Sequence, residues 1–181
     1  MKKSILTFVA VAAISLTAMS QKLTTSKSHI KFYSHTSVED IEANNYKAVG
    51  TINPENGVVV FSIPMQSFEF EKSLMQKHYN SVKFLDTKQF PKAKLKGTIS
   101  NLSAVNFKKD GSYNVTVKGN LTLHGVTNSV TEKATISIKG GKVSVVSKFN
   151  ITLADYKVAF VKGKPSTNVA KTVEVTLNAQ Y

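Results

Sequence analysis

Apolar and polar side chains alternate along much of the second half of this chain. In residues 92–99, small or apolar side chains hold the odd positions and polar side chains the even ones, and the same parity returns in 115–123, 143–153 and 173–179. Residues 134–138 alternate with the apolar side chains on even positions. A period of two is typical of a strand with one buried and one solvated face. The pattern therefore predicts a chain dominated by β-structure.

Turn-forming residues separate these runs. Asn53–Gly57, Lys109–Ser112 and Lys139–Lys142 combine glycine with asparagine, aspartate, proline or lysine, as hairpin turns do. The pattern predicts about eight strands, near residues 28–36, 45–53, 57–64, 92–102, 112–124, 126–139, 142–153 and 169–180. Many long antiparallel strands in one small domain favour a closed up-and-down barrel, so the expected fold is an all-β, eight-stranded antiparallel barrel.

One segment between the third and fourth predicted strands lacks the alternation. Residues 70–84 are expected to form a short helical flap that lies across an end or the side of the barrel. Its apolar side chains can gather on one side of a helix; they are Leu74, Met75, Tyr79 and Val82. A briefer helical turn is expected at Ser37–Asp40, with Ser37 as its cap.

The first twenty residues have the layout of a secretory signal peptide. Lys2 and Lys3 precede an uncharged apolar run from Ile5 to Ala18, and Ala18-Met19-Ser20 provides a small-x-small cleavage site. We expect residues 1–20 to be removed and residues 21–181 to form one exported domain, periplasmic or secreted. The chain contains no cysteine, so its stability has to come from packing and strand pairing, and thiolate chemistry is excluded.

The formal net charge is +13, and every cationic side chain apart from histidine is a lysine. Base recognition and bidentate phosphate binding favour arginine, and tryptophan is also absent. We therefore expect no nucleic-acid partner. A lysine-rich surface is compatible with transient contact with an anionic membrane.

His78, Ser81 and Asp86 lie close together in the sequence and raise the alternative of a hydrolase. Ser81 lacks the Gly-x-Ser-x-Gly turn that presents a nucleophile. Asp86 and Gln89 instead have the spacing of a capping box before Phe90-Pro91. Capping and packing are the favoured interpretation, and no catalytic role is expected.

The four histidines, His29, His35, His78 and His124, show no helical or strand spacing of metal ligands. No Gly-rich phosphate loop or dinucleotide fingerprint occurs, so we expect neither a metal nor a cofactor.

A barrel of eight strands can be filled by side chains or can hold one small ligand. The inward positions include small residues that would leave space in the lumen, namely Ala93, Gly97, Gly119, Ala134, Ser147 and Ala179. Glycines also mark strand bends, so the pattern alone leaves an open and a packed lumen as alternatives.

Two segments resemble the signature segments of the YceI-like family. The first runs from His78-x-x-Ser81 through Phe84-Leu85-Asp86 to Gln89–Ala93, and the second is Gly119–Thr127. Phe149-x-Ile151 followed by Asp155-Tyr156 is similar to a third segment, although Lys157 and the polar loop 162–166 replace the glycine that usually follows. The resemblance spans the mature chain and implies an exported, lipocalin-like barrel that carries polyisoprenoid lipids in an apolar channel.

We therefore expect an exported carrier that binds an isoprenoid-type lipid or another apolar ligand in its lumen. The expected lining side chains come from the inward positions and the flap: Phe32, Phe61, Phe68, Leu74, Met75, Phe84, Leu95, Leu121, Phe149 and Leu177. One alternative is a non-catalytic interaction module with a filled core and a lysine-rich docking surface. The other is the hydrolase that uses His78, Ser81 and Asp86.

Overall fold

The described residues form one large antiparallel sheet and one short helix. A computed structural model describes residues 22–158, 160–161, 164–165 and 168–181. Its strands are β1 Leu23–Thr24, β2 Lys27–His35, β3 Asp40–Asn45, β4 Val49–Ile52, β5 Val58–Pro64, β6 Glu69–Phe70, β7 Lys92–Ile99, β8 Gly111–Leu123, β9 Val126–Lys139, β10 Lys142–Thr152, β11 Phe160–Val161, β12 Lys164–Pro165 and β13 Thr172–Gln180. Its helical elements are η1 Met65–Ser67, α1 Ser73–Asn80, η2 Leu102–Ala104 and η3 Leu153–Tyr156.

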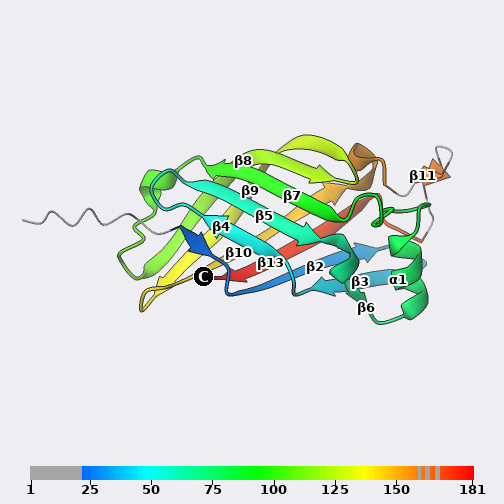
Figure 1. Ribbon diagram of the computed structural model, residues 1–181, viewed down its shortest axis with the longest axis horizontal. Coiled ribbons are helices and arrows are strands. Elements are labelled where there is room, and N and C mark those ends of the chain that lie inside the picture. Colours follow the sequence, from blue (N-terminus) through cyan, green and yellow to red (C-terminus); the bar gives the residue numbers. More distant parts are fainter. Residues whose placement is uncertain (1–21, 159, 162–163, 166–167) are drawn as a thin grey trace, which may run out of the picture.

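Eleven of the strands lie in one sheet, in the order β1-β4-β5-β7-β8-β9-β10-β13-β2-β3-β6. The sheet curls into a half-barrel around an interior, with α1 at one end (Figure 1). Among the described strands, β1 and β6 are the two edges of this sheet. The all-β antiparallel prediction is confirmed, whereas the predicted count of eight strands is not, because short strands such as β1 and β6 carry too few residues to show an alternating pattern.

The predicted strand at 45–53 is shorter in the structure, where β4 covers only Val49–Ile52, and a bend at Asn45 separates it from the unpredicted β3. The Asn45 side chain is fully buried, its amide donates to the carbonyl oxygen of Pro64 (2.8 Å), and its side-chain oxygen accepts from the Lys47 amide (2.9 Å). These bonds turn the chain out of β3, which pairs with β2, and into β4, which pairs with β5. The sequence pattern missed β3 for this reason.

The helical turn predicted at Ser37–Asp40 is a hairpin turn instead. His35 and Asp40 are opposite each other in the β2–β3 ladder. The hydroxyl of Thr36, not of Ser37, accepts from the amides of Val38 (3.2 Å) and Glu39 (3.0 Å). A threonine that bonds the backbone in this way stabilises a tight turn without a helix.

The helix predicted at 70–84 is confirmed in type but covers only Ser73–Asn80. Phe70 belongs to β6, where it lies opposite Ala43 of β3. At the other end Ser81 is extended, and its hydroxyl donates to the carbonyl of His78 (2.7 Å). Pairing before the helix and this turn after it confine α1 to two turns at the end of the sheet (Figure 1).

Two of the small inward residues bring β7 and β8 close together. Gly97 and Gly119 are opposite each other in the ladder. A Cβ atom on Gly97 would lie 2.8 Å from the carbonyl oxygen of Lys118, and one on Gly119 would collide with the carbonyl oxygen of Lys96. These glycines therefore permit a close backbone approach and do not widen the interior.

β9 and β10 pair over only part of their length. Their ladder runs as far as Ala134 opposite Ser147 and stops there. Residues 126–133 of β9 remain paired with β8, and residues 148–152 of β10 remain paired with β13. We call the stretch between these two segments the β9–β10 gap.

Candidate functional site

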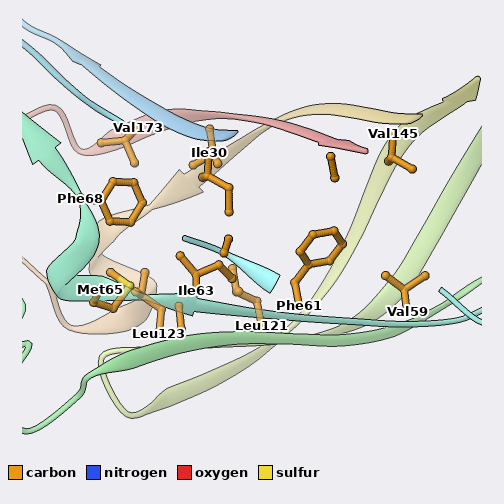
Figure 2. Close-up of a cluster of buried hydrophobic side chains, with 14 of the residues drawn as sticks. Ile30, Val59, Phe61, Ile63, Met65, Phe68, Leu121, Leu123, Val145 and Val173 are labelled. Atoms are coloured by element: carbon orange, nitrogen blue, oxygen red, sulfur yellow. The ribbon is translucent and has the colours of Figure 1, made fainter. Parts of the chain in front are cut away.

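The inner face of the curled sheet borders a cavity of about 710 Å³. Figure 2 shows Ile30 and Val173 on one side of this interior and Phe61, Ile63 and Leu121 on the other, all pointing inward. The volume lies within the range of about 300–1,000 Å³ that is usual for small-molecule sites. A cavity of this size contradicts the filled core on which the docking-module alternative was based.

The predicted lining residues border this cavity with one exception. Those that do so are Phe32, Phe61, Phe68, Met75, Phe84, Leu95, Leu121, Phe149 and Leu177. Leu74 is 61% exposed, and its predicted place in the lumen is wrong. Met75 and Tyr79 are one helical turn apart and face the cavity, so the side of α1 that carries Leu74 points to solvent. That the lining side chains contact a ligand stays a prediction.

An aromatic cluster closes the helix end of the cavity. The ring of Phe32 lies 5.4 Å from that of Phe68 and 5.7 Å from that of Phe70, and Tyr79 lies 4.9 Å from Phe70 and 6.4 Å from Phe84 between ring centroids. Pairs at such distances stabilise beyond their buried area. The cluster joins α1 to β2 and β6 through side chains that also face the cavity.

Tyr79 was not among the predicted lining residues, although its spacing from Met75 was the signal that could have identified it. It is 5% exposed, and its hydroxyl has no hydrogen-bond partner among the described residues. Burial raises the pKa of Tyr79 well above its usual value. The Tyr79 side chain is therefore uncharged, and its hydroxyl group forms no hydrogen bond that would hold the helix in place.

His78, Ser81 and Asp86 do not form a catalytic arrangement. The Ser81 hydroxyl donates to the backbone carbonyl of His78 and not to its ring. The Asp86 carboxylate accepts weakly from the Gln89 amide (3.4 Å), as one half of a capping box. The geometry supports the capping interpretation, because no base contacts the hydroxyl that a hydrolase would need to activate.

The other histidines are held by separate partners. His29 lies 2.7 Å from the side-chain oxygen of Asn44, His35 lies 2.5 Å from Asp40, and Nδ1 of His124 lies 3.1 Å from the carbonyl oxygen of Tyr156. Within the described ranges, no three histidine, aspartate or glutamate side chains gather as metal ligands. No helix in the described part of the chain, α1 included, is long and apolar enough to cross a membrane.

The polar side chains that border the cavity include two groups. One group lies beside α1 and comprises Glu39, His78, Ser81 and Lys83. The other lies along the β9–β10 gap and comprises Asn128, Ser129, Glu132, Asn150, Thr152 and Asp155. Sequence reasoning missed the second group, because the even-numbered apolar run of β9 was followed no further back than Ala134.

Glu132 is the acidic member of this group that shares the inward parity of Ala134 and Ile136. It lies opposite Val117 in the β8–β9 ladder and is partly buried. Burial raises the pKa of Glu132 above its usual value. An inward carboxyl group in an otherwise apolar wall is a polar contact available to a ligand.

Comparison with known proteins identifies the family. The family model described as YceI-like domain matches residues 21–181. None of the curated proteins compared with the chain matches it.

Several solved structures share the fold. A polyisoprenoid-binding domain from Saccharophagus degradans, implicated in plant cell wall breakdown, superposes with a TM-score of 0.73 at 15% identity over 87% of this chain and 96% of that one. BcnA of Burkholderia cenocepacia gives a TM-score of 0.71 at 19% identity over 85% and 96%. The YceI protein of Campylobacter jejuni gives 0.57 at 16% identity over 100% and 98%. Together with the domain match, the curled sheet and its apolar cavity lead to one conclusion: the chain belongs to the YceI-like family.

Proposed function

We propose that this protein binds a chain-like apolar ligand, a polyisoprenoid or a related lipid, in the cavity of its curled sheet. The observation that carries the proposal is the cavity of about 710 Å³ with its aliphatic and aromatic wall. Each buried CH₂ group contributes about 0.8 kcal/mol, so an isoprene unit contributes at most roughly 4 kcal/mol. A few units offset the ordering costs of binding without a dense set of polar contacts.

One of the solved structures supports the same ligand class. The domain from Saccharophagus degradans is described as polyisoprenoid-binding, and it shares the fold of this chain. The proposal extends that ligand class to this chain because apolar side chains line the cavity from strands on opposite sides of it. Phe61 and Val145 are two of these side chains (Figure 2).

Mass spectrometry of an organic extract of the purified protein tests the proposal. A long-chain lipid in near-stoichiometric amount is expected, and delipidated protein should regain it when an isoprenoid alcohol is added. An extract without lipid, together with no binding of the added alcohol, would contradict the function.

We also propose that the protein acts outside the cytoplasm. The supporting feature is the charged, apolar and small-residue layout of residues 1–20, which lie outside the described part of the chain. Intact-mass measurement of the protein from a bacterial host is expected to give a chain beginning at Gln21 in the exported fraction. A product that keeps residues 1–20 there would refute cleavage at this site.

Delivery of a lipid requires contact with its source, and we propose an anionic membrane surface. Val38, Leu74 and Val82 are 64%, 61% and 80% exposed. Lys72 and Glu39 form an ion pair (3.7 Å) that links the β2–β3 turn to α1, so Val38 and Leu74 lie at the same end of the molecule.

Anionic vesicles should retain the wild type better than the Leu74→Ser variant. Their retention of the wild type should also be weaker at high salt than at low salt. Retention that is equal for both variants would contradict this surface.

A further inference from the structure

The residues that border the cavity extend into the β9–β10 gap. The gap is bounded at one end by the Ser147 hydroxyl, which donates to the carbonyl oxygen of Lys133 (2.7 Å). At the other end the Asn128 amide donates to the carbonyl oxygen of Asp155 (2.8 Å). Ser129 and Asn150 are exposed and yet border the cavity. Side chains on the outer face can border an inner cavity only where the wall between them is open.

Glu132 lies between these two boundaries. The structure gives its carboxyl group no hydrogen bond and no ion pair within the described residues, while its backbone lies opposite Val117 on the inner face. Tyr156 is close enough that Glu132 adds to the rise of its pKa, after the larger effect of burial, and Asn128 lowers that pKa through a side-chain hydrogen bond. An acceptor, an amide and a phenol thus meet at the gap.

The strand edges at the gap add backbone groups to this arrangement. Past Ala134 and Ser147, the edges of β9 and β10 have no ladder between them. An unpaired strand edge presents donors and acceptors to whatever lies beside it. The gap and the group beside α1 are therefore the two polar parts of a cavity whose remaining wall is mainly apolar.

We propose that the β9–β10 gap holds the polar end of the ligand, and that this end is an uncharged hydroxyl group which donates a hydrogen bond to Glu132. The inference rests on the proposed function: the apolar chain fills the cavity, and the gap determines which head group the chain carries. The same hydroxyl group can still accept a hydrogen bond, and the Asn128 amide and the Tyr156 phenol, which also border the cavity, are the donors nearest to the gap in sequence.

Charge selects the hydroxyl over ionic head groups. A phosphate at the gap would meet the carboxyl groups of Glu132 and Asp155, and among the described residues the only lysine that borders the cavity is Lys83, beside α1. An ammonium group would lose its hydration and would approach a protein in which lysines far outnumber the acidic residues. A neutral donor avoids both costs.

The test compares three probes that share the same apolar chain and differ in their head group: geranylgeraniol, its methyl ether and its phosphate. Their dissociation constants are measured on delipidated wild-type protein by displacement of a fluorescent apolar probe. The alcohol is expected to bind at least about tenfold more tightly than the ether, because a hydrogen bond to a charged acceptor contributes about 1.5–3 kcal/mol. The phosphate is expected to bind more weakly than the alcohol.

Two pairs of variants locate the contact. Glu132→Leu should abolish the preference for the alcohol over the ether, and Glu42→Leu, on the exposed outer face of β3, should keep it. Asn150→Trp should weaken binding of the alcohol by narrowing the gap, and Asn178→Trp, an exposed position on β13, should not.

The outcomes separate the two proposals. Equal binding of alcohol and ether, tightest binding of the phosphate, or an unchanged preference in Glu132→Leu overturns the head-group site and leaves the carrier function standing. Failure of all three probes to bind overturns the carrier function itself. The comparison on the wild type needs no variant, so the inference remains falsifiable if Glu132→Leu does not fold.

Discussion

Glu132 places a carboxyl group on the inner face of β9, in line with Ala134 and Ile136 and opposite Val117. A partly buried carboxyl group without a compensating bond opposes folding whenever it is ionised. Its two inward neighbours on β9, Val130 and Ala134, are apolar and carry no such cost. At the scale of single residues, this acid therefore lowers stability at a place where the proposed ligand would use it.

The Glu132→Gln variant is expected to be more stable than the wild type at pH 8, with a smaller difference at pH 4. Burial raises the pKa of Glu132 in the folded protein above the value of about 4.3 in the unfolded chain. The folded state then binds more protons between these two pKa values. The stability that protonated Glu132 contributes is complete below the unfolded pKa and is lost as the pH rises through the folded pKa.

Urea unfolding at pH 4 and pH 8 measures this difference. Glu71→Gln, at an exposed position before α1, controls for the loss of one negative charge. A stability gain of Glu132→Gln that stays the same at both pH values, or that shrinks toward pH 8, would show that burial does not raise this pKa.

At the scale of elements, α1 is fixed to the sheet mainly by aromatic packing. Its N-terminal cap, Lys72, makes no side-chain hydrogen bond to the helix amides, whereas Tyr79 contacts Phe32, Phe68 and Phe70 with centroid distances of 4.9–5.8 Å. Burial of the ring is therefore the main term that holds the helix at the end of the cavity.

Two substitutions at Tyr79 separate the ring from its hydroxyl. Tyr79→Phe removes a buried hydroxyl without a partner, so the free energy of unfolding should stay equal or rise by up to about 1 kcal/mol. Tyr79→Ala removes the ring and should lower it by about 3–5 kcal/mol. Denaturant midpoints of the two variants measure the effects, and a clear destabilisation by Tyr79→Phe would mean that the hydroxyl has a partner in solution.

The strand pattern could be predicted where both faces of a strand differ in polarity for its whole length. The ends of β7, β8, β9 and β10 were anticipated to within three residues, because most of their inward positions are apolar or small and glycine-containing turns separate β8, β9 and β10. β3 was missed because the bend at Asn45 depends on a bond to Pro64, nineteen residues away, which no local pattern shows.

The candidate site was predictable only in its apolar part. Inward parity identified side chains such as Phe61 and Leu177, whereas Leu74 failed because a short helix can turn either flank to solvent. The β9–β10 gap could not be anticipated, since the alternation of β10 continues past Ser147 while its pairing with β9 stops there. Pairing is a property of two strands, and the sequence pattern describes one strand at a time.

At the scale of the whole molecule, the family retains its fold at very low identity. The structures compared above share 15–19% of residues with this chain and still superpose over most of it. What they share with it is a curled antiparallel sheet, and an apolar interior constrains the polarity of the inward positions more than their identity. This tolerance suits a binding site that selects a ligand by its length and apolar surface.

Titration with a fluorescent apolar chain probe tests the central claim that the cavity is the binding site. Leu95→Trp adds bulk to the lining of the cavity, and Lys96→Trp adds the same bulk to the exposed face of the same strand. The account predicts saturable binding by the wild type and by Lys96→Trp, competition by geranylgeraniol, and an affinity at least about tenfold weaker for Leu95→Trp. Equal affinities for the two tryptophan variants, or no saturable binding by the wild type, would contradict it.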